Sequence, residues 1–205
     1  MGKIFYLIGK SATGKDSLLE RLSADPALAL SGIVQYTTRP IRGGEEEGRD
    51  YHFITIPESD ALEAAGKIIE MREYQTVHGP WRYMLVDDGG VDLTARDYIA
   101  VGTIGSYVKV RDWFGDKNVV PIYIEVETGQ RLKRALDREL NHARPKYAEM
   151  CRRFLADEQD FDMAHLKEAG LADEDGHITN CFENDVFEDC LAAVRAFILK
   201  EKGAS

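Results

Sequence analysis

The chain has 205 residues, 44% of them hydrophobic, which is enough for one domain with a substantial core. Its formal net charge of −10 argues against a general nucleic-acid-binding surface and suits small anionic substrates if positive charge is concentrated locally. No apolar run is long enough to span a membrane, and the chain starts with a strand pattern instead of a signal peptide, so we expect a cytoplasmic protein without a membrane partner.

Apolar runs alternate with helical patterns along the chain, an order typical of a parallel sheet covered by helices on both faces. Strands are predicted at residues 3–8, 32–37, 50–56, 68–74, 81–86, 98–103, 119–126 and 178–182. Helices are predicted at residues 15–24, 59–65, 106–113, 130–140, 146–159 and 186–200, with Ser59 or Asp60 as the cap of the second. Turns are expected at His78-Gly79-Pro80 and Asp87-Asp88-Gly89-Gly90, and the acidic segment 160–177 is expected to be a flexible excursion. The spacing of Cys151, Cys181 and Cys190 matches no metal site and predicts reduced thiols.

A phosphate-binding loop is predicted directly after the first strand. The segment Gly9-Lys10-Ser11-Ala12-Thr13-Gly14-Lys15 is a Gly-x-x-x-x-Gly-Lys loop that opens a helix, the order of a P-loop. Its glycines allow a tight turn with inward N–H groups, and its lysine adds positive charge for the β- and γ-phosphates. The alternative is an ordinary glycine-rich turn with a solvated lysine. The residues expected to bind a nucleotide here are Gly9, Ser11, Ala12, Thr13, Gly14, Lys15, Asp16 and Ser17.

The residue after Lys15 departs from the usual motif, which has Ser or Thr there to bind Mg²⁺. Here Asp16 is followed by Ser17. Asp16 can bind the metal directly or through water, since Mg²⁺ prefers oxygen ligands. It can equally be an exposed first-turn residue that favours the helix dipole. Both interpretations stay open, and Asp16 and Ser17 are the predicted metal ligands.

A second anion site is predicted around Arg39 and Arg42. Their side chains can converge on one tetrahedral anion, and Tyr51 can add a hydroxyl donor. The alternative is a pair of surface arginines balanced by the acids at 45–47. Residues 131–153 are also strongly basic, which indicates either a bound polyphosphate or a salt-bridged, solvated helix pair.

The two motifs together resemble the guanylate kinase family. The resemblance rests on the P-loop, on Thr37-Thr38-Arg39-Pro40-Ile41-Arg42-Gly43-Gly44-Glu45 and on Gly48-Arg49-Asp50-Tyr51-His52-Phe53. It covers most of the chain and is strongest over residues 3–56. It implies a P-loop NTPase three-layer α/β fold with a central parallel sheet, a small mixed acceptor-binding sub-domain and a helical lid. The implied boundaries are about 1–34, 97–130 and 178–205 for the core, about 35–96 for the acceptor-binding sub-domain, about 131–160 for the lid and about 160–177 for the acidic excursion.

The resemblance also implies roles for individual residues. The acceptor would be held by Arg39, Arg42, Tyr51 and Glu70, the last through guanine N1–H and the exocyclic amine, although a glutamate at a strand end is often merely solvated. The catalytic residues would be Lys15, Arg39, Arg134 and Arg153. Asn184 corresponds to a residue beside the adenine of the donor.

The chain departs from the family pattern around the base of the acceptor. Gln35 replaces a serine, Trp81-Arg82-Tyr83-Met84 replaces Tyr-Tyr-Gly-Ser/Thr, and Ala100 and Gly102 stand where aspartates are expected. We predict that Arg82 reinforces the phosphate grip and that Asp87 or Asp88 supplies part of the missing acidic function.

The predicted function is that of an ATP- and Mg²⁺-dependent nucleoside monophosphate kinase with GMP as the favoured acceptor, acting as a monomer or homodimer. One alternative is a P-loop kinase for dGMP or another phosphorylated small molecule, favoured by Asp16, Met84 and the changes at 100 and 102. The other is a binding module that has lost catalysis, against which the intact Gly9, Gly14 and Lys15 count.

Overall fold

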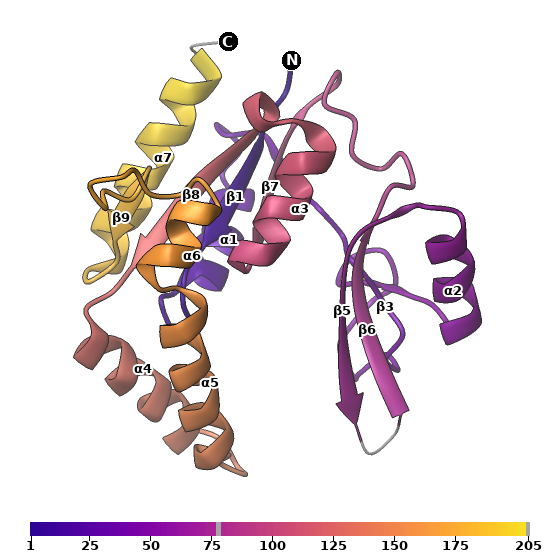
Figure 1. Ribbon diagram of the computed structural model, residues 1–205, viewed down its shortest axis with the longest axis horizontal. Helices are drawn as coiled ribbons and strands as arrows, with labels where there is room; N and C mark the ends of the chain where they lie inside the picture. Colours follow the sequence, from indigo (N-terminus) through magenta and orange to yellow (C-terminus); the bar gives the residue numbers. More distant parts are fainter. Residues whose placement is uncertain (77–78, 204–205) are drawn as a thin grey trace.

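A five-stranded sheet forms the centre of the protein in the computed structural model, which describes residues 1–76 and 79–203. The strand order is β2-β7-β1-β8-β9, and every pairing is parallel (Figure 1). The strands are β1 (Ile4–Ile8), β2 (Leu30–Gly32), β7 (Asp97–Gly102), β8 (Val119–Glu125) and β9 (Cys181–Glu183). All of β1 is buried, because this central strand is covered on both faces.

Helices cover both faces of the central sheet (Figure 1). Ile4, Tyr6 and Ile8 belong to one buried cluster with residues of α3 (Ile104–Phe114) and α6 (Met163–Glu168). Phe5 and Leu7 point the other way and cluster with residues of α1 (Lys15–Ser23) and α7 (Phe187–Gly203), as expected when successive strand side chains alternate between faces. The predicted α/β class, with helices on both faces of a parallel sheet, is confirmed.

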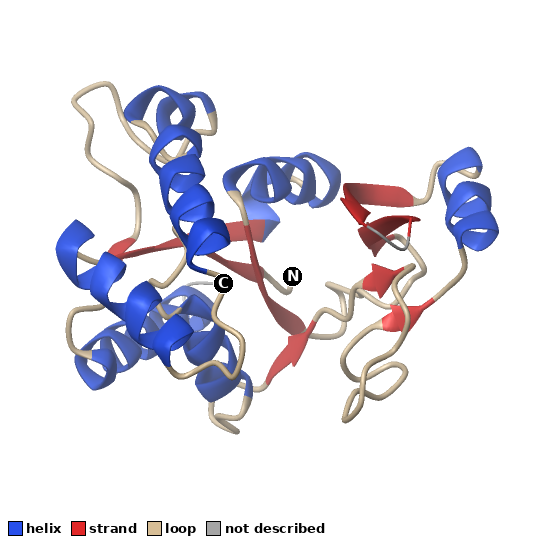
Figure 2. Ribbon diagram, turned by 90° about the horizontal axis from the view of Figure 1, so that it is seen from below, coloured by secondary structure: helices blue, strands red, loops and turns tan. Residues whose placement is uncertain are grey.

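A second, mixed sheet has the order β4-β3-β6-β5. Its strands are β3 (Tyr36–Thr37), β4 (His52–Phe53), β5 (Ile68–Thr76) and β6 (Gly79–Val86). This sheet and α2 (Ile56–Ala64) stand to one side of the main helical body (Figure 2). On the opposite side of the molecule, α4 (Thr128–Leu140) packs against α5 (Tyr147–Asp160), and a short 3₁₀ turn, η1 (Asp116–Asn118), precedes β8. None of the helices in the described ranges is both long and apolar enough to span a bilayer.

The structure corrects three of the predicted elements. The predicted strand 32–37 is two strands, β2 and β3, which belong to different sheets. The helix predicted at 59–65 begins at Ile56, because Thr55 and Glu58 form a capping box in place of the predicted caps. The segment 160–177 is not a flexible excursion, since it contains α6 and buries Phe161 and Leu171 in the core.

Two further predictions concern a turn and the thiols. His78, in the turn predicted at 78–80, lies outside the described residues, whereas Gly79 already belongs to β6. All three cysteines are free thiols, as predicted.

Candidate active site

A cavity of about 1160 Å³ lies between the P-loop, the small sheet and α5. Pockets for one small ligand are usually roughly 300–1,000 Å³, so this cavity is larger than one small ligand usually needs. The P-loop side contributes Gly9, Ser11, Lys15 and Asp16. The small-sheet side includes Arg42, Tyr51, Arg72, Trp81 and Tyr83, and α5 contributes Arg152, Arg153 and Asp157.

The P-loop is held from behind by Asn184. The Asn184 amide donates a hydrogen bond to the Thr13 carbonyl at 2.6 Å, and the buried Thr13 hydroxyl donates to the Lys10 carbonyl at 2.9 Å. Gly14 has φ +85°, and a Cβ there would lie 2.6 Å from Asn184 Nδ2, so this close approach requires glycine. Asn184 is buried and does not line the cavity. It supports the loop, and its place beside the base of a donor nucleotide stays a prediction.

Lys15 and Asp16 present opposite charges to the cavity. Lys15 Nζ donates to the Lys10 carbonyl at 3.2 Å, and burial lowers the pKa of its ammonium. Asp16 lines the cavity, whereas Ser17 is exposed and does not line it. Of the two predicted metal ligands, the structure therefore places Asp16 alone in the cavity.

A carboxylate of the protein itself accepts a hydrogen bond from the P-loop. The Ser11 N–H donates to Asp157 Oδ2 at 2.7 Å, and Lys10 Nζ lies 2.8 Å from Glu158 Oε2. Between these two carboxylates lies the buried guanidinium of Arg131, which pairs with both and stacks 3.8 Å from the Phe154 ring centroid. The Ser11 amide is thus aimed at negative charge, as a phosphate site requires. Sequence reasoning missed Arg131 and Asp157, because no local pattern shows that α4 and α5 meet here.

The two predicted lid arginines have different positions. Arg153 lines the cavity, and its side chain is 60% exposed, 3.8 Å from Glu149. Arg134 instead donates to the backbone carbonyls of Asn184 and Asp185, at 2.7 and 3.1 Å, and does not line the cavity. The structure therefore brings Arg153, and not Arg134, to the predicted phosphates.

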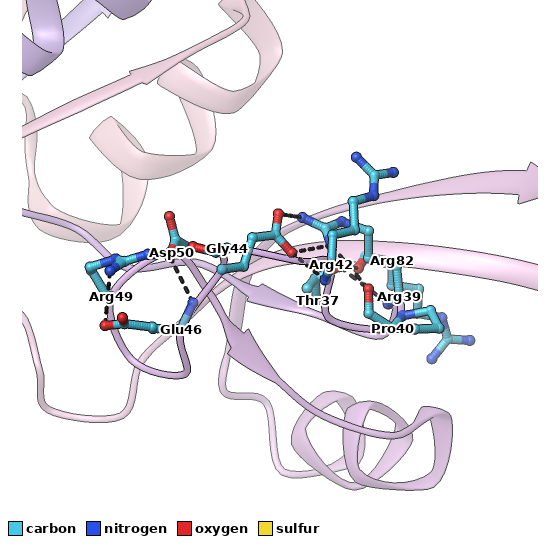
Figure 3. A network of polar contacts seen from close by, with 10 residues as sticks. Thr37, Arg39, Pro40, Arg42, Gly44, Glu46, Arg49, Asp50 and Arg82 are labelled. Carbon is cyan, nitrogen blue, oxygen red and sulfur yellow. Dashed lines mark hydrogen bonds and ion pairs between the residues drawn. The ribbon is translucent and has the colours of Figure 1, made fainter.

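In the predicted anion loop, Arg42 and Tyr51 line the cavity, whereas Arg39 is buried. Figure 3 shows Arg39 and Arg42 within one network of polar contacts. The buried Arg39 donates to both oxygens of Glu45, at 2.7 and 2.6 Å, and its guanidinium carbon lies 5.0 Å from the Tyr51 ring centroid. Glu45 also accepts the Arg42 N–H at 2.8 Å. The Arg39 bonds and then the Arg42 N–H lower the pKa of Glu45 to about 2. Arg42 and Tyr51 can both reach an anion bound in the cavity. Direct contact between Arg39 and such an anion stays a prediction.

The prediction for Arg82 is wrong, because alternation along β6 turns its side chain away from the cavity. Trp81 and Tyr83 line the cavity, whereas Arg82 pairs with Asp60 at 2.5 Å and with Glu73 at 2.9 Å on the α2 side. Met84 shares that side, where it is fully buried and accepts a hydrogen bond from Ser59.

Two further corrections follow from the lining of the cavity. Neither Asp87 nor Asp88 reaches it, and Asp88 accepts a hydrogen bond from the Tyr36 hydroxyl at 2.7 Å. The Tyr83 hydroxyl side chain, which sequence reasoning passed over, stands edge-on to Tyr51. Strand alternation puts Tyr83 on the same face as Trp81, and the structure shows that this face meets the cavity.

A buried carboxylate lies next to Arg72, which lines the cavity, but it does not line the cavity itself. Glu70 is 3% exposed, and its Oε1 lies 2.9 Å from Arg72 Nε. Burial raises the pKa of Glu70, against the opposing influence of the Arg72 charge. Its second oxygen, Oε2, has no hydrogen-bond partner among the described residues. Because Glu70 does not itself line the cavity, its contact with a guanine base stays a prediction.

Comparisons with known proteins agree with this arrangement. The sequence model of the family described as Guanylate kinase matches residues 1–80. A guanylate kinase of Koribacter versatilis is 33% identical over 207 residues, covering 98% of this chain and 79% of its own length. A guanylate kinase of Ralstonia nicotianae is 30% identical over 206 residues, covering 96% of this chain and 80% of its own length. The crystal structure of guanylate kinase from Anaplasma phagocytophilum matches with a TM-score of 0.59 and 23% identity over 98% of this chain and 86% of that chain, a likeness of fold.

Proposed function

Because this chain belongs to the guanylate kinase family, we propose that it transfers the γ-phosphoryl group of ATP to GMP, giving ADP and GDP. The observation that carries the proposal is that the P-loop and the pair Arg42 and Tyr51 face one cavity, which is larger than one small ligand usually needs. The acceptor phosphate is already an anionic nucleophile, so no strong general base is required. The barrier is charge repulsion and positioning, which fixed cations and hydrogen-bond donors lower.

The cavity side chains divide this work between them. Lys15 and Arg153 would screen the transferring phosphoryl group, while Arg42 and Tyr51 hold the acceptor in line. Asp16 offers the carboxylate oxygen that Mg²⁺ favours, beside the lysine of the P-loop. Mg²⁺, when bound, neutralises charge on the β- and γ-phosphates. Glu70 would accept hydrogen bonds from guanine N1–H and its exocyclic amine.

The proposal is tested by ADP release from Mg-ATP with GMP, dGMP, AMP, CMP, UMP and no acceptor. Selective turnover of GMP is the expected result. Ala100 and Gly102 line the cavity without polar side chains, so a preference for dGMP or another phosphorylated acceptor is the second candidate. ATP binding without turnover of any acceptor would contradict the kinase assignment and favour a binding module.

Removing the carboxylate that sits on the P-loop is expected to tighten ATP binding. In Asp157→Ala the Ser11 N–H no longer donates to a protein anion, so phosphate oxygens meet no competitor there. We expect the KM for ATP to fall roughly fivefold, as for one hydrogen bond worth about 1 kcal/mol. Asp160→Ala is the matched control, since Asp160 lines the same cavity from the same helix. A higher KM for ATP in Asp157→Ala would show that this carboxylate assists the nucleotide.

Acceptor binding is expected to weaken as the pH falls from neutral. Burial raises the pKa of Glu70, so this carboxylate protonates at higher pH than an exposed glutamate and then loses an acceptor oxygen. Because the folded protein binds this proton more readily than the unfolded chain, Glu70 reduces stability as the pH rises through its raised pKa. The KM for GMP should rise on acidification, and Glu70→Gln should flatten that dependence. A pH profile unchanged in Glu70→Gln would contradict the assignment.

A further inference from the structure

Strand β5 carries two neighbouring side chains of opposite charge, of which Arg72 lines the cavity and Glu70 lies buried beside it. Glu70 and Arg72 are two residues apart, so both point to the same face of the small sheet, opposite Leu85 and Tyr83 of β6. Arg72, Tyr83 and Leu85 line the cavity. Arg72 therefore stands between Glu70 and the open part of the site.

The guanidinium of Arg72 is poorly satisfied by the protein. Its Nε lies 2.9 Å from Glu70 Oε1, but no hydrogen bond forms in that direction. Its Nη2 makes a hydrogen bond to Gln35 Oε1 that is 3.5 Å long, at the outer limit of such bonds. The side chain is 30% exposed. Arginines normally use their donors fully, so the terminal N–H groups, which the long bond to Gln35 satisfies poorly, can donate to a ligand in the cavity.

Arg72 presents donors to the cavity, and the carboxylate of Glu70 lies directly beside it as an acceptor. Guanine presents the complementary edge: N1–H and the 2-amino group donate, and O6 accepts, with N7 as a further acceptor on the same side as O6. Adenine presents an amino donor where guanine has O6, and it would meet the Arg72 cation with a donor. Arginine donating to O6 and N7 is the commonest specific contact to guanine.

We propose that Arg72 is a specificity-determining residue that donates to guanine O6, while Glu70 accepts from N1–H and the 2-amino group. The proposal rests on the proposed function, because it names how that acceptor is selected. Arg72 supplies the polar contact that Met84, Ala100 and Gly102 do not: Met84 faces α2, and the other two carry no polar side chain. It also repels an amino group at position 6, which gives selection against adenine as well as for guanine.

The test compares three acceptors on wild type and Arg72→Met. GMP has O6, N1–H and the 2-amino group, IMP lacks the amino group, and 2-aminopurine riboside monophosphate lacks both O6 and N1–H. We expect kcat/KM for GMP and for IMP to fall by the same factor, about 10- to 100-fold. The kcat/KM of the 2-aminopurine acceptor, or its inhibition constant as a competitor of GMP, should change by less than about threefold between wild type and variant. This small change also shows that the variant is folded.

Other outcomes separate the competing explanations. If Arg72 only supports Glu70, Arg72→Met should reduce the ratio of GMP to IMP turnover in the same way as Glu70→Gln, and that result would overturn the proposal. Equal turnover of GMP by wild type and Arg72→Met would also overturn it. Arg96→Met is the control, because Arg96 is exposed just before β7, at the end of that strand remote from the P-loop. Failure of wild type to phosphorylate GMP and IMP would instead reject the proposed function.

Discussion

Alanine at Lys15 is expected to lower turnover at saturating ATP and GMP by about 100- to 1,000-fold, the effect of removing one preorganised charge partner of a transition state. The Lys15 ammonium lines the cavity beside Ser11 and Asp16, where the transferring phosphoryl group is proposed to lie. Its bond to the Lys10 carbonyl, at 3.2 Å, is weak, so the protein itself gains little from it.

The same substitution should leave stability unchanged or higher. Burial lowers the pKa of Lys15, which means that the charged ammonium is less favourable in the folded protein than in the unfolded chain. A lysine shifted in this direction reduces the free energy of unfolding at pH values below its lowered pKa, and the reduction disappears as the pH rises through it. Loss of activity without loss of melting temperature would therefore mark Lys15 as a functional residue.

A surface lysine provides the comparison for Lys15. Lys133 is 74% exposed on α4 and pairs with Asp137 one turn away, a contact worth about 0.3–0.5 kcal/mol. Lys133→Ala should keep wild-type turnover. Turnover of Lys15→Ala at the wild-type rate, or a loss of activity that simply follows a lower melting temperature, would contradict the mechanism.

The P-loop could be predicted from the sequence because its determinants are local. A buried strand, two glycines, a lysine and a helix start within fifteen residues specify the backbone that holds a phosphate. The roles around it depend on long-range packing. Asn184 reaches Thr13 across the sheet, and Arg134 reaches the backbone beside Asn184, neither of which can be inferred from spacing.

Helix α4 shows why the lid was harder to predict. A hydrophobic pattern would turn Leu132 and Leu136 inward, yet they are 43% and 40% exposed, while Arg131 and Ala135 are buried. The guanidinium of Arg131 is compensated by two carboxylates and an aromatic ring from α5, so its burial depends on a partner helix. The small sheet presents the same difficulty: alternation predicts two faces of β6, but only the packing of the small sheet beside the P-loop and α5 shows that Trp81, Tyr83 and Leu85 meet the cavity.

The second large effect is expected at Arg39. Arg39→Ala leaves Glu45 without its two charge-assisted bonds and removes the cation beneath the Tyr51 ring. These bonds hold the loop that presents Arg42 and Tyr51 to the cavity, so the KM for GMP should rise by roughly an order of magnitude or more, while the KM for ATP changes little. Arg82→Ala tests the neighbouring arginine that faces α2, and its KM for GMP should stay within about twofold of wild type.

Glu45→Gln separates the two ways in which Arg39 can act. The pKa of Glu45 is held at about 2, first by Arg39 and then by the Arg42 N–H, so this carboxylate stabilises the loop above its ordinary pKa and loses that contribution only as the pH falls toward 2. If Arg39 works by fixing the loop through Glu45, Glu45→Gln and Arg39→Ala should raise the KM for GMP together. If Arg39 turns from Glu45 to the acceptor phosphate, Glu45→Gln should leave that KM nearly unchanged or lower it. The buried position of Arg39 and its two bonds to Glu45 favour the first result, and a lower KM in Glu45→Gln would contradict it.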